Sequence, residues 1–526
     1  MPKVLISDKM ASGAAKIFRE RGLDVDVITG MTPEELKEVI CTYDGLAVRS
    51  ATKVTREILT AAPNLKVIGR AGIGVDNVDI PAATAQGTIV MNTPFGNAIT
   101  TAEHTISMMM SLVRHIPLAN TSTHEGKWEK TKFMGTELFG KTLGVIGAGN
   151  IGTIVIDRAQ GLKMRVIAFD PFLSAERATE MAIEKVTMDE LLARADIITI
   201  HTPMTDHTKG ILNKDTLAQT KQGVRIINCA RGGLIVEEDL KSAIESGHVA
   251  GAAFDVFSEE PAKENALFGM PQVICTPHLG ASTTEAQDNV ALQVAEQIAD
   301  YLLTGAVTNA LNAPSVSAEE APRLAPYIEL TRQMGSFAGQ ITETSIKSVI
   351  FELQGHAADL NNTLPLKSAL AEGLLKPMVS NVNMVNAPKI AKDRGMEYNE
   401  VKTDRTGDYQ TLLTLTVNTE RQSRTIRGTL THGTKPRLVD IHGVNMEAEL
   451  GPFMLYVTNH DQPGFIGALG TALGDAKINV ATFYLGRRVL GKDALSLIQV
   501  DKAADDETLS KIRALEHVKE VKQLSF

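Results

Sequence analysis

The chain has 526 residues, 43% of them hydrophobic and 22% charged, a length that predicts roughly three to four domains, each with its own core. The net charge of −9 gives no electrostatic reason to expect nucleic acid or an anionic membrane as a partner. No apolar run approaches the roughly 20 residues needed to cross a bilayer, and MPKVLISDKM at the N-terminus indicates a strand rather than a signal peptide. Three widely spaced cysteines (Cys41, Cys229 and Cys275) suit neither a disulfide framework nor a metal site. These features predict a cytoplasmic enzyme or sensor without a metal.

Residues 1 to about 95 alternate short apolar runs with amphipathic segments, which is typical of a parallel sheet covered on both faces. A long helix is expected from Ile99 to about Val113, ending near Pro117. The strands expected in this part are KVLIS, LDVDVIT, GLAVR, LKVIGRAG and TIVMN.

A second α/β series follows and is complete by about residue 281. A helix from about Ser282 to Leu303 should then return the chain to the first domain. The strands expected in the second series are TLGVIG, MRVIAFD, DIITIHTP, VRIINCA, GAAFDV and QVICTPH.

The glycine loop Gly147-Ala148-Gly149-Asn150-Ile151-Gly152 lies between the strand TLGVI and a helix. Its glycines allow a tight turn, close approach of a pyrophosphate and close packing of helix against strand, and the helix N-terminus attracts the phosphates. Asp170 ends the next strand, 18 residues after Gly152, where a carboxylate binds the ribose hydroxyls and repels a 2′-phosphate. The loop therefore predicts a dinucleotide site that prefers NAD to NADP. Because the loop lies mid-chain, the domain that contains it is expected to be inserted in another domain.

Arg231, Glu260 and His278 follow consecutive expected strands of the second series, in NCARGG, DVFSEEP and TPHLGAS. The carboxyl ends of parallel strands share one edge, so the three side chains are expected in one cleft. Imidazole accepts protons near neutrality, a carboxylate can orient it, and a guanidinium matches a carboxylate or a developing carbonyl. Each residue alone is typical of an ordinary loop. Their joint position behind a dinucleotide loop predicts oxidation of a 2-hydroxy acid.

Residues 312–326 (NAPSVSAEEAPRLAP) are expected to form a linker. Residues 327–450 predict a hairpin from YQTLLTLTV and SRTIRGTLT, and no group of residues there suggests chemistry. The last segment, 451–526, has the strand and helix order of a ferredoxin-like βαββαβ unit.

The motifs GRAGIGVDNVD, MNTPFGN, GKTLGVIGAGNIG, NCARGG, DVFSEEP and TPHLGAS occur in order. With them the sequence resembles the D-isomer-specific 2-hydroxyacid dehydrogenases over essentially the whole chain, most closely the long branch that acts on D-3-phosphoglycerate. The resemblance implies Arg231 as substrate-binding cation, Glu260 as partner of the histidine, and His278 as acid/base. It further implies that the bound NAD touches Ile73, Gly147, Gly149, Asn150, Ile151, Gly152, Asp170, Thr202, Cys229, Ala230, Arg231, Asp255, His278, Gly280 and Ala281.

The expected fold is α/β, with a Rossmann-type cofactor domain (98–281) inserted in a flavodoxin-like substrate-binding domain (1–97 and 282–312). An intervening α+β domain (313–450), like the allosteric-substrate-binding domain of the long branch, and a C-terminal domain (451–526) follow. The segment 454–487 resembles an ACT domain, a ferredoxin-like module that senses small molecules. The resemblance implies that L-serine binds between two copies at positions matching Asn459, Asp461 and Asn479; a purely structural, dimer-forming ACT domain is the alternative. Asp461, Pro463 and Gly464 are expected in the turn after its first strand.

A phosphorylated substrate requires additional cations, and Arg49 (with Ser50) and Arg70 follow strands of the first domain. The free N–H groups of Ala71-Gly72-Ile73-Gly74 are expected to hold the substrate's carboxylate. The expected substrate-binding residues are Arg49, Ser50, Arg70, Gly72, Ile73, Gly74, Arg231 and His278. The lysine-rich segment 127–138 is a further candidate, contributed by a neighbouring subunit.

The predicted function is NAD-dependent oxidation of D-3-phosphoglycerate to 3-phosphohydroxypyruvate, the first step of L-serine biosynthesis. Another D-2-hydroxy acid, such as glycerate or 2-hydroxyglutarate, and a non-catalytic NAD-sensing regulator are the alternatives. The long helix from Ile99 and the C-terminal domain each suggest self-association, so a homodimer or homotetramer is expected.

Overall fold

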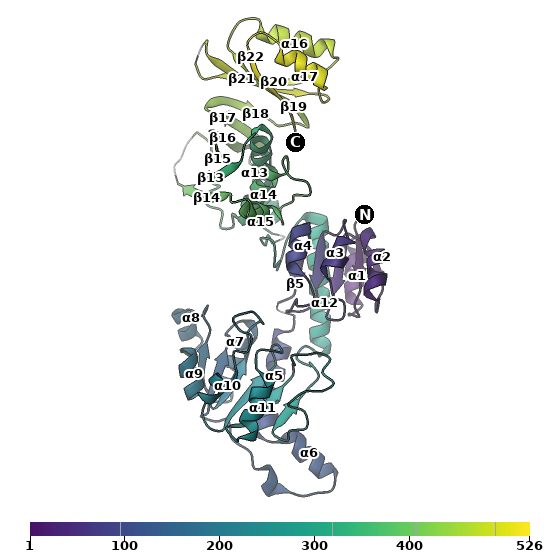
Figure 1. Ribbon diagram of the computed structural model, residues 1–526, viewed down its shortest axis with the longest axis vertical. Helices are drawn as coiled ribbons and strands as arrows, with labels where there is room; N and C mark the ends of the chain where they lie inside the picture. Colours follow the sequence, from purple (N-terminus) through teal and green to yellow (C-terminus); the bar gives the residue numbers. More distant parts are fainter. Residues whose placement is uncertain (95, 318, 405–407, 490) are drawn as a thin grey trace.

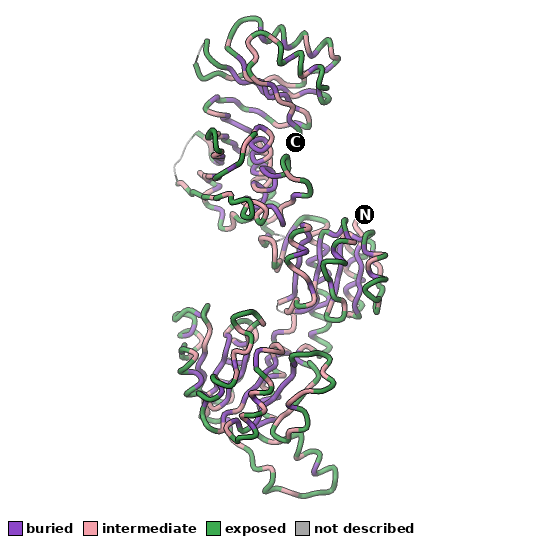
Figure 2. Tube along the Cα trace, viewed as in Figure 1, coloured by how far each residue is buried: buried purple, intermediate pink, exposed green. Residues whose placement is uncertain are grey.

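The computed structural model describes residues 1–526 except 95, 318, 405–407 and 490. Phe95 of the MNTPFGN motif and Ala318 of the expected linker therefore lie outside the described residues. Four sheets follow one another along an elongated molecule, with the second sheet at one end and the C-terminal sheet at the other (Figure 1). The central strands of the sheets are mostly buried, and most exposed residues lie on the helices, loops and edge strands around them (Figure 2).

The first sheet is parallel, with the flavodoxin-like strand order β2-β1-β3-β4-β5 that the sequence predicted. Helix α12, which follows the second sheet in the chain, returns to pack on this first sheet. Gly69 of β4 permits that packing, since a Cβ atom there would lie 2.5 Å from the Val294 side chain of α12. The elements are β1 (Lys3–Ile6), α1 (Gly13–Glu20), β2 (Asp24–Val27), α2 (Pro33–Val39), a 3₁₀ turn (Ile40–Thr42), β3 (Gly45–Val48), α3 (Arg56–Thr60), β4 (Val67–Arg70), α4 (Ile80–Gln86), β5 (Ile89–Asn92) and α12 (Thr284–Thr304).

The second sheet is also parallel, and its order, β12-β11-β10-β9-β6-β7-β8, is that of a doubly wound dinucleotide-binding fold. The strand order reverses between β6 and β9, which places a ligand crevice at the carboxyl end of β6. The elements are α5 (Ala98–Val113), α6 (Ile116–His124), a 3₁₀ turn (Lys130–Phe133), β6 (Thr142–Ile146), α7 (Asn150–Gly161), β7 (Arg165–Phe169), α8 (Ala175–Glu180), β8 (Glu184–Lys185), α9 (Met188–Arg194), β9 (Ile197–Ile200), α10 (Lys214–Ala218), β10 (Val224–Asn228), α11 (Glu237–Glu245), β11 (Val249–Phe254) and β12 (Val273–Cys275).

The expectation that the helix from Ile99 ends the helical stretch near Pro117 is wrong. Helix α5 does end at Val113, but a second helix, α6, begins at Ile116 after a left-handed residue, His115. Pro117 lies in the first turn of α6, where proline is tolerated because the N–H groups there have no partner within the helix.

The third sheet is mixed, with the order β14-β13-β15-β16-β17-β18, and it contains the predicted hairpin as the antiparallel pair β15–β16. The linker prediction is wrong in its second half, because α13 begins at Ala321 and includes Pro326. Buried residues further along α13, such as Leu330 and Phe337, hold the helix against the sheet. The elements are α13 (Ala321–Ile341), β13 (Ile346–Gly355), α14 (Leu364–Leu375), α15 (Ala387–Asp393), β14 (Glu397–Thr403), β15 (Thr411–Thr419), β16 (Ser423–Thr431), β17 (Lys435–Ile441) and β18 (Val444–Ala448).

The C-terminal sheet, of order β20-β21-β19-β22, is antiparallel and has the predicted βαββαβ chain order. One hydrophobic core joins it to the third sheet, since Met454 and Leu497 belong to the same buried cluster as Leu415 and Phe337. The elements are β19 (Phe453–His460), α16 (Phe465–Asp475), β20 (Val480–Arg487), β21 (Asp493–Val500), α17 (Asp506–Arg513) and β22 (Val518–Ser525).

We propose the expected boundaries as domain limits, since α5 packs on the second sheet and α12 on the first. The proposed domain limit at residue 450 divides the chain, but the third sheet and the C-terminal sheet on either side of it share one hydrophobic core. None of the described helices has the length and apolar character that crossing a membrane would require.

We predict that Gly69→Ala weakens the first domain by about 1–3 kcal/mol, because the added methyl group overpacks the contact between β4 and α12. A lower thermal midpoint would show this. The matched control is Gly161→Ala at the end of α7, where no heavy atom lies within 4 Å of the added Cβ. Equal midpoints for the two variants would contradict the role given to Gly69.

Candidate active site

The central feature of the site is a hydrogen-bonded pair of side chains, His278 and Glu260. The Nδ1 atom of His278 lies 2.6 Å from Glu260 Oε2, and the other carboxylate oxygen, Oε1, accepts the Phe257 N–H at 3.0 Å. His278 follows β12, Glu260 follows β11, and His278 has a left-handed backbone with φ of 55°. Since Glu260 engages Nδ1, the Nε2 atom is the one left for a substrate.

The pKa values of the pair shift in the directions expected for an acid–base partnership. The hydrogen bond to Glu260 raises the pKa of His278 above 6.5, and this outweighs the opposing effect of burial. Burial alone would raise the pKa of Glu260, but hydrogen bonds from His278 and from the Phe257 N–H lower it. Glu260 is therefore ionised at neutral pH and stabilises a protonated His278.

Asp255, one of the expected cofactor contacts, holds the backbone of the histidine loop. Its side chain is fully buried and accepts hydrogen bonds from the N–H groups of Leu279 (2.7 Å) and Gly280 (2.8 Å) and from the Thr276 hydroxyl (2.6 Å). His104 Nε2 lies 3.2 Å from the same carboxylate. Burial raises the pKa of Asp255, but these donors outweigh it and lower the pKa, so the group is a fixed anion beneath His278. Sequence reasoning missed Thr276 and His104, although Thr276 lies within the TPH motif.

Arg231 extends from the end of β10 to the first domain. Its Nε donates to Asp76 Oδ2 at 3.0 Å and its Nη1 to the Ala230 carbonyl at 2.7 Å. Its Nη2 lies against Gly74, where a Cβ atom would be 1.6 Å away. Asp76 was not predicted, although it lies in the GRAGIGVDNVD motif. Arg231 thus lies where the two domains meet.

The glycine loop has the geometry that a pyrophosphate requires. A Cβ atom on Gly147 would lie 2.7 Å from the His201 carbonyl oxygen, and one on Gly152 would lie 2.1 Å from the Gly147 carbonyl oxygen. Gly149, by contrast, faces open space and precedes the first residue of α7, Asn150. The loop therefore presents bare backbone at the N-terminus of α7, where the helix dipole attracts an anion.

Asp170 ends β7 beside this loop, as predicted, and its two oxygens accept the N–H groups of Ala148 and Phe172, each at 2.8 Å. On the other side of the loop, Thr202 Oγ1 and His201 Nδ1 are buried without a hydrogen-bond partner among the described residues. Buried polar atoms normally have partners. The two unpaired atoms therefore fit a bound dinucleotide that supplies those partners, and NAD matches the donor set.

Of the other expected cofactor contacts, Cys229 is buried at the end of β10, and burial raises the pKa of its thiol to about 12. The thiol therefore remains neutral. Ile73 and Ala281 are partly buried. A Cβ atom added to Gly280 would lie 3.1 Å from the Asp255 carboxylate.

Arg70, at the end of β4, is a largely buried cation. Burial, with smaller contributions from Arg231 and Arg49, lowers its pKa to about 10, and its Nε has no hydrogen-bond partner among the described atoms. Its Nη1 lies against Gly72. Arg49 donates from Nη1 to the Lys9 carbonyl at 3.1 Å, and its neighbour Ser50 is exposed. Arg49, Arg70 and Arg231 thus form one cationic group, since β3 and β4 are neighbouring strands and the charges of Arg49 and Arg231 both act on Arg70.

The expected anion nest at Ala71–Gly74 is wrong in its first half. The Ala71 N–H donates to the Val48 carbonyl at 2.8 Å, and the Gly72 N–H donates to Thr93 Oγ1 at 2.6 Å. These two N–H groups are therefore already hydrogen-bonded within the protein. They connect the end of β4 to β3 and to the segment after β5.

The three expected effector residues do not meet within one chain. Asn459 pairs with Ala494 on β21, whereas Val480, which follows Asn479, pairs with Val500 at the far end of that strand. Six residues of strand separate the two positions by roughly 20 Å. Asn459 is buried, and Asp461 accepts from Arg487 at 2.8 Å and from the Gly491 N–H at 3.1 Å.

Comparison with known proteins agrees with this fold. The NAD binding domain of the D-isomer specific 2-hydroxyacid dehydrogenases matches residues 106–280, and the D-3-phosphoglycerate dehydrogenase intervening domain matches residues 323–442. The NAD⁺-bound 3-phosphoglycerate dehydrogenase of Entamoeba histolytica superposes with a TM-score of 0.51 at 30% identity, covering 59% of this chain and 98% of that one. The fold and site thus define an NAD-binding dehydrogenase of D-2-hydroxy acids.

Full-length relatives narrow the class. The D-3-phosphoglycerate dehydrogenase of Bacillus subtilis is 42% identical over 527 residues, covering 100% of both chains. That of Methanocaldococcus jannaschii is 39% identical, covering 99% of both. The chain belongs to the D-3-phosphoglycerate dehydrogenase family.

We predict that Glu260→Gln moves the acid limb of the kcat/KM profile for hydroxy-acid oxidation to lower pH. His278 must be neutral to accept a proton, so activity rises as pH passes its pKa, which Glu260 holds above 6.5. Without the carboxylate that pKa falls, while maximal kcat also falls because the neutral amide stabilises the imidazolium less. Glu259→Gln, at the exposed neighbouring position, is the control. An unmoved limb in Glu260→Gln would exclude His278 as the titrating base.

Proposed function

We propose that the protein oxidises the C2 hydroxyl of D-3-phosphoglycerate to give 3-phosphohydroxypyruvate, with NAD as the oxidant, as the first step of L-serine biosynthesis. The observation that carries this proposal is the 2.6 Å pair of His278 and Glu260, with Arg231 close enough for its charge to act both on His278 and on Arg70. Full-length relatives that are D-3-phosphoglycerate dehydrogenases support the substrate.

Each residue has a defined part in this reaction. NAD, when bound, supplies the nicotinamide carbon that accepts the hydride from C2. His278 takes the hydroxyl proton at Nε2 as the C2–O bond becomes a carbonyl, and Glu260 stabilises the imidazolium that results. Arg231 binds the substrate's carboxylate or polarises the new carbonyl. In the reverse direction, His278 returns the proton.

Arg70 and Arg49 are proposed to hold the phosphate. A buried guanidinium with an unpaired Nε is costly unless an anion joins it, and a phosphate dianion offsets that cost best. Another hydroxy acid such as glycerate would leave Arg70 without a partner. The non-catalytic alternative is disfavoured, because a protein that only binds NAD has no need of the Glu260–His278 hydrogen bond.

Self-association and an effector belong to the same proposal. Between α5 and β6, large apolar side chains are exposed, which favours a dimer or tetramer; they include Ile116, Leu118, Trp128, Met134 and Phe139. Asn459 and Asp461 lie at the opposite end of the C-terminal sheet from Asn479, so L-serine would contact all three only between two copies. We also propose that the protein acts in the cytoplasm.

The direct test is NADH formation at 340 nm with D-3-phosphoglycerate, D-glycerate, D-lactate and D-2-hydroxyglutarate, together with the reverse assay using 3-phosphohydroxypyruvate and NADH. We expect a clear preference for the phosphorylated substrate. Turnover of another acid alone would reject the substrate but keep the mechanism. NADH binding without turnover of any substrate would favour the regulator.

We predict that Arg70→Met raises KM for D-3-phosphoglycerate roughly ten- to a hundredfold, as expected for loss of a charged hydrogen bond. KM for D-glycerate, which lacks the phosphate, should change little. Arg19→Met on the exposed face of α1 is the control for loss of one positive charge. Equal increases in both KM values would place Arg70 away from the phosphate.

A further inference from the structure

Residues 381–386, in the connection between α14 and α15 of the third domain, dock on the turn between α4 and β5 of the first domain. Val385 is buried in the same hydrophobic cluster as strand residues of the first sheet. Earlier in the chain, Asn312 holds this turn through hydrogen bonds to the Thr84 hydroxyl, the Thr88 carbonyl and the Val90 N–H. The third domain therefore meets the first domain at the α4–β5 turn.

The side-chain amide of Asn383 bonds both domains at this contact. Its Oδ1 atom accepts the N–H groups of Val385 at 2.9 Å and Asn386 at 3.2 Å, which closes the local turn before α15. Its Nδ2 atom donates to the Gly87 carbonyl of the first domain at 2.9 Å. Gly87 has a φ of 87°, and a Cβ atom on it would lie 2.0 Å from Asn383 Nδ2, so the contact requires glycine. The oxygen of the amide thus serves the third domain, and the nitrogen serves the contact between domains.

Gly87 is the shared end of two elements that lead to the loop of residues 71–79, which we call the substrate loop. Helix α4 begins directly after this loop and extends roughly 10 Å to Gly87. Strand β5 begins two residues after Gly87, and at its far end the Nδ2 atom of Asn92 donates to a carbonyl of the loop at 2.6 Å. The loop contains Asp76, which is paired with Arg231 at 3.0 Å. A displacement of Gly87 is therefore transmitted to the substrate loop through both elements.

We propose that Asn383 of the third domain is a positioning residue for substrate binding. By holding Gly87, it fixes α4 and β5, and these fix the loop that contacts Arg70 and Arg231. The inference rests on the proposed function, which assigns the substrate to those two arginines. NAD is proposed to bind on the second sheet, so its affinity should not depend on Asn383.

The test is Asn383→Asp in the full-length protein, assayed by initial rates of NADH formation. The carboxylate of this variant still accepts the N–H groups of Val385 and Asn386, but it has no hydrogen to donate to the Gly87 carbonyl. We expect KM for D-3-phosphoglycerate to rise about three- to tenfold, as for loss of one hydrogen bond, while kcat and KM for NAD change less than about twofold. Asn383→Ser, whose hydroxyl is one atom shorter and does not reach Gly87, should give the same increase.

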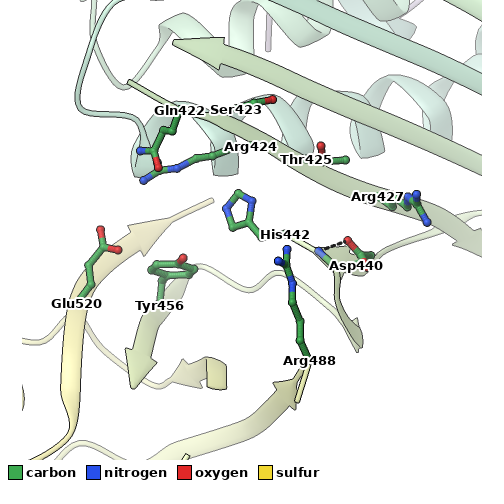
Figure 3. A pocket seen from close by; sticks show the side chains of 11 residues that line it. Gln422, Ser423, Arg424, Thr425, Arg427, Asp440, His442, Tyr456, Arg488 and Glu520 are labelled. Carbon is green, nitrogen blue, oxygen red and sulfur yellow. Dashed lines mark hydrogen bonds between the residues drawn. The ribbon is translucent and has the colours of Figure 1, made fainter. Parts of the chain in front are cut away.

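The matched control is Asn381→Asp, which places the same negative charge two residues away on an exposed side chain and should leave every KM unchanged. The contact lies at the end of the third domain opposite its junction with the C-terminal sheet (Figure 1). At that junction Arg424 and Arg488 line an open cleft (Figure 3), which both variants should leave intact. An unchanged KM for D-3-phosphoglycerate in Asn383→Asp overturns the proposal, as does an equal rise in KM for NAD or in Asn381→Asp.

Hydrogen–deuterium exchange tests the same contact without turnover. In Asn383→Asp the backbone amides of Val78 and Asp79, which are hydrogen-bonded at the start of α4, should exchange faster, and those of the glycine loop 147–152 should not. A wild-type protein that does not turn over D-3-phosphoglycerate would reject the proposed function. Exchange would then decide the role of Asn383, and equal exchange in Asn383→Asp and wild type would overturn it.

Discussion

The buried carboxylate of Asp255 is the constraint on which the catalytic arrangement depends. It lies at the end of β11 and fixes residues 276–280 by accepting two backbone N–H groups, of Leu279 and Gly280, and the Thr276 hydroxyl. A loop held in this way can keep His278 in a left-handed conformation that most residues avoid. Glu260 lies in the same connection, between β11 and β12, and one hydrogen bond from it then fixes the imidazole ring of His278. Fixed backbone and fixed ring together give the base a single orientation before any ligand arrives.

Two parallel sheets bring the remaining groups to this base. The strand order of the second sheet reverses beside β6, and the glycine loop follows that strand. In the first sheet, Arg49 follows β3 and Arg70 ends β4. These arginines would be distant from His278 if the chain did not pass from the first sheet to the second and return along α12. The nesting of one sheet within the sequence of another is thus what places cations from one domain beside the histidine of the other.

Much of this arrangement could be predicted from the sequence, because its signals are local. Apolar runs identified the strands of both parallel sheets except the short, exposed edge strand β8, and glycine spacing identified the dinucleotide loop at Gly147–Gly152. The failures concern contacts that local patterns do not contain. The N–H groups of Ala71 and Gly72 are used by Val48 and Thr93, and α13 persists through Pro326 because its later residues are buried against a sheet.

The ion pair between Arg231 and Asp76 affects both the affinity for an anionic ligand and the rate at which an anionic product leaves. If Arg231 binds the substrate's carboxylate as proposed, an incoming acid competes with Asp76, a tethered carboxylate that lies 3.0 Å from the guanidinium and acts at high effective concentration. This competition lowers the affinity for the acid. It also speeds dissociation of the product, because Asp76 can form its ion pair with Arg231 again as the product leaves. Asp76 is itself largely exposed and so returns to water at little cost when displaced. The pair therefore exchanges some affinity for faster release of an anionic product.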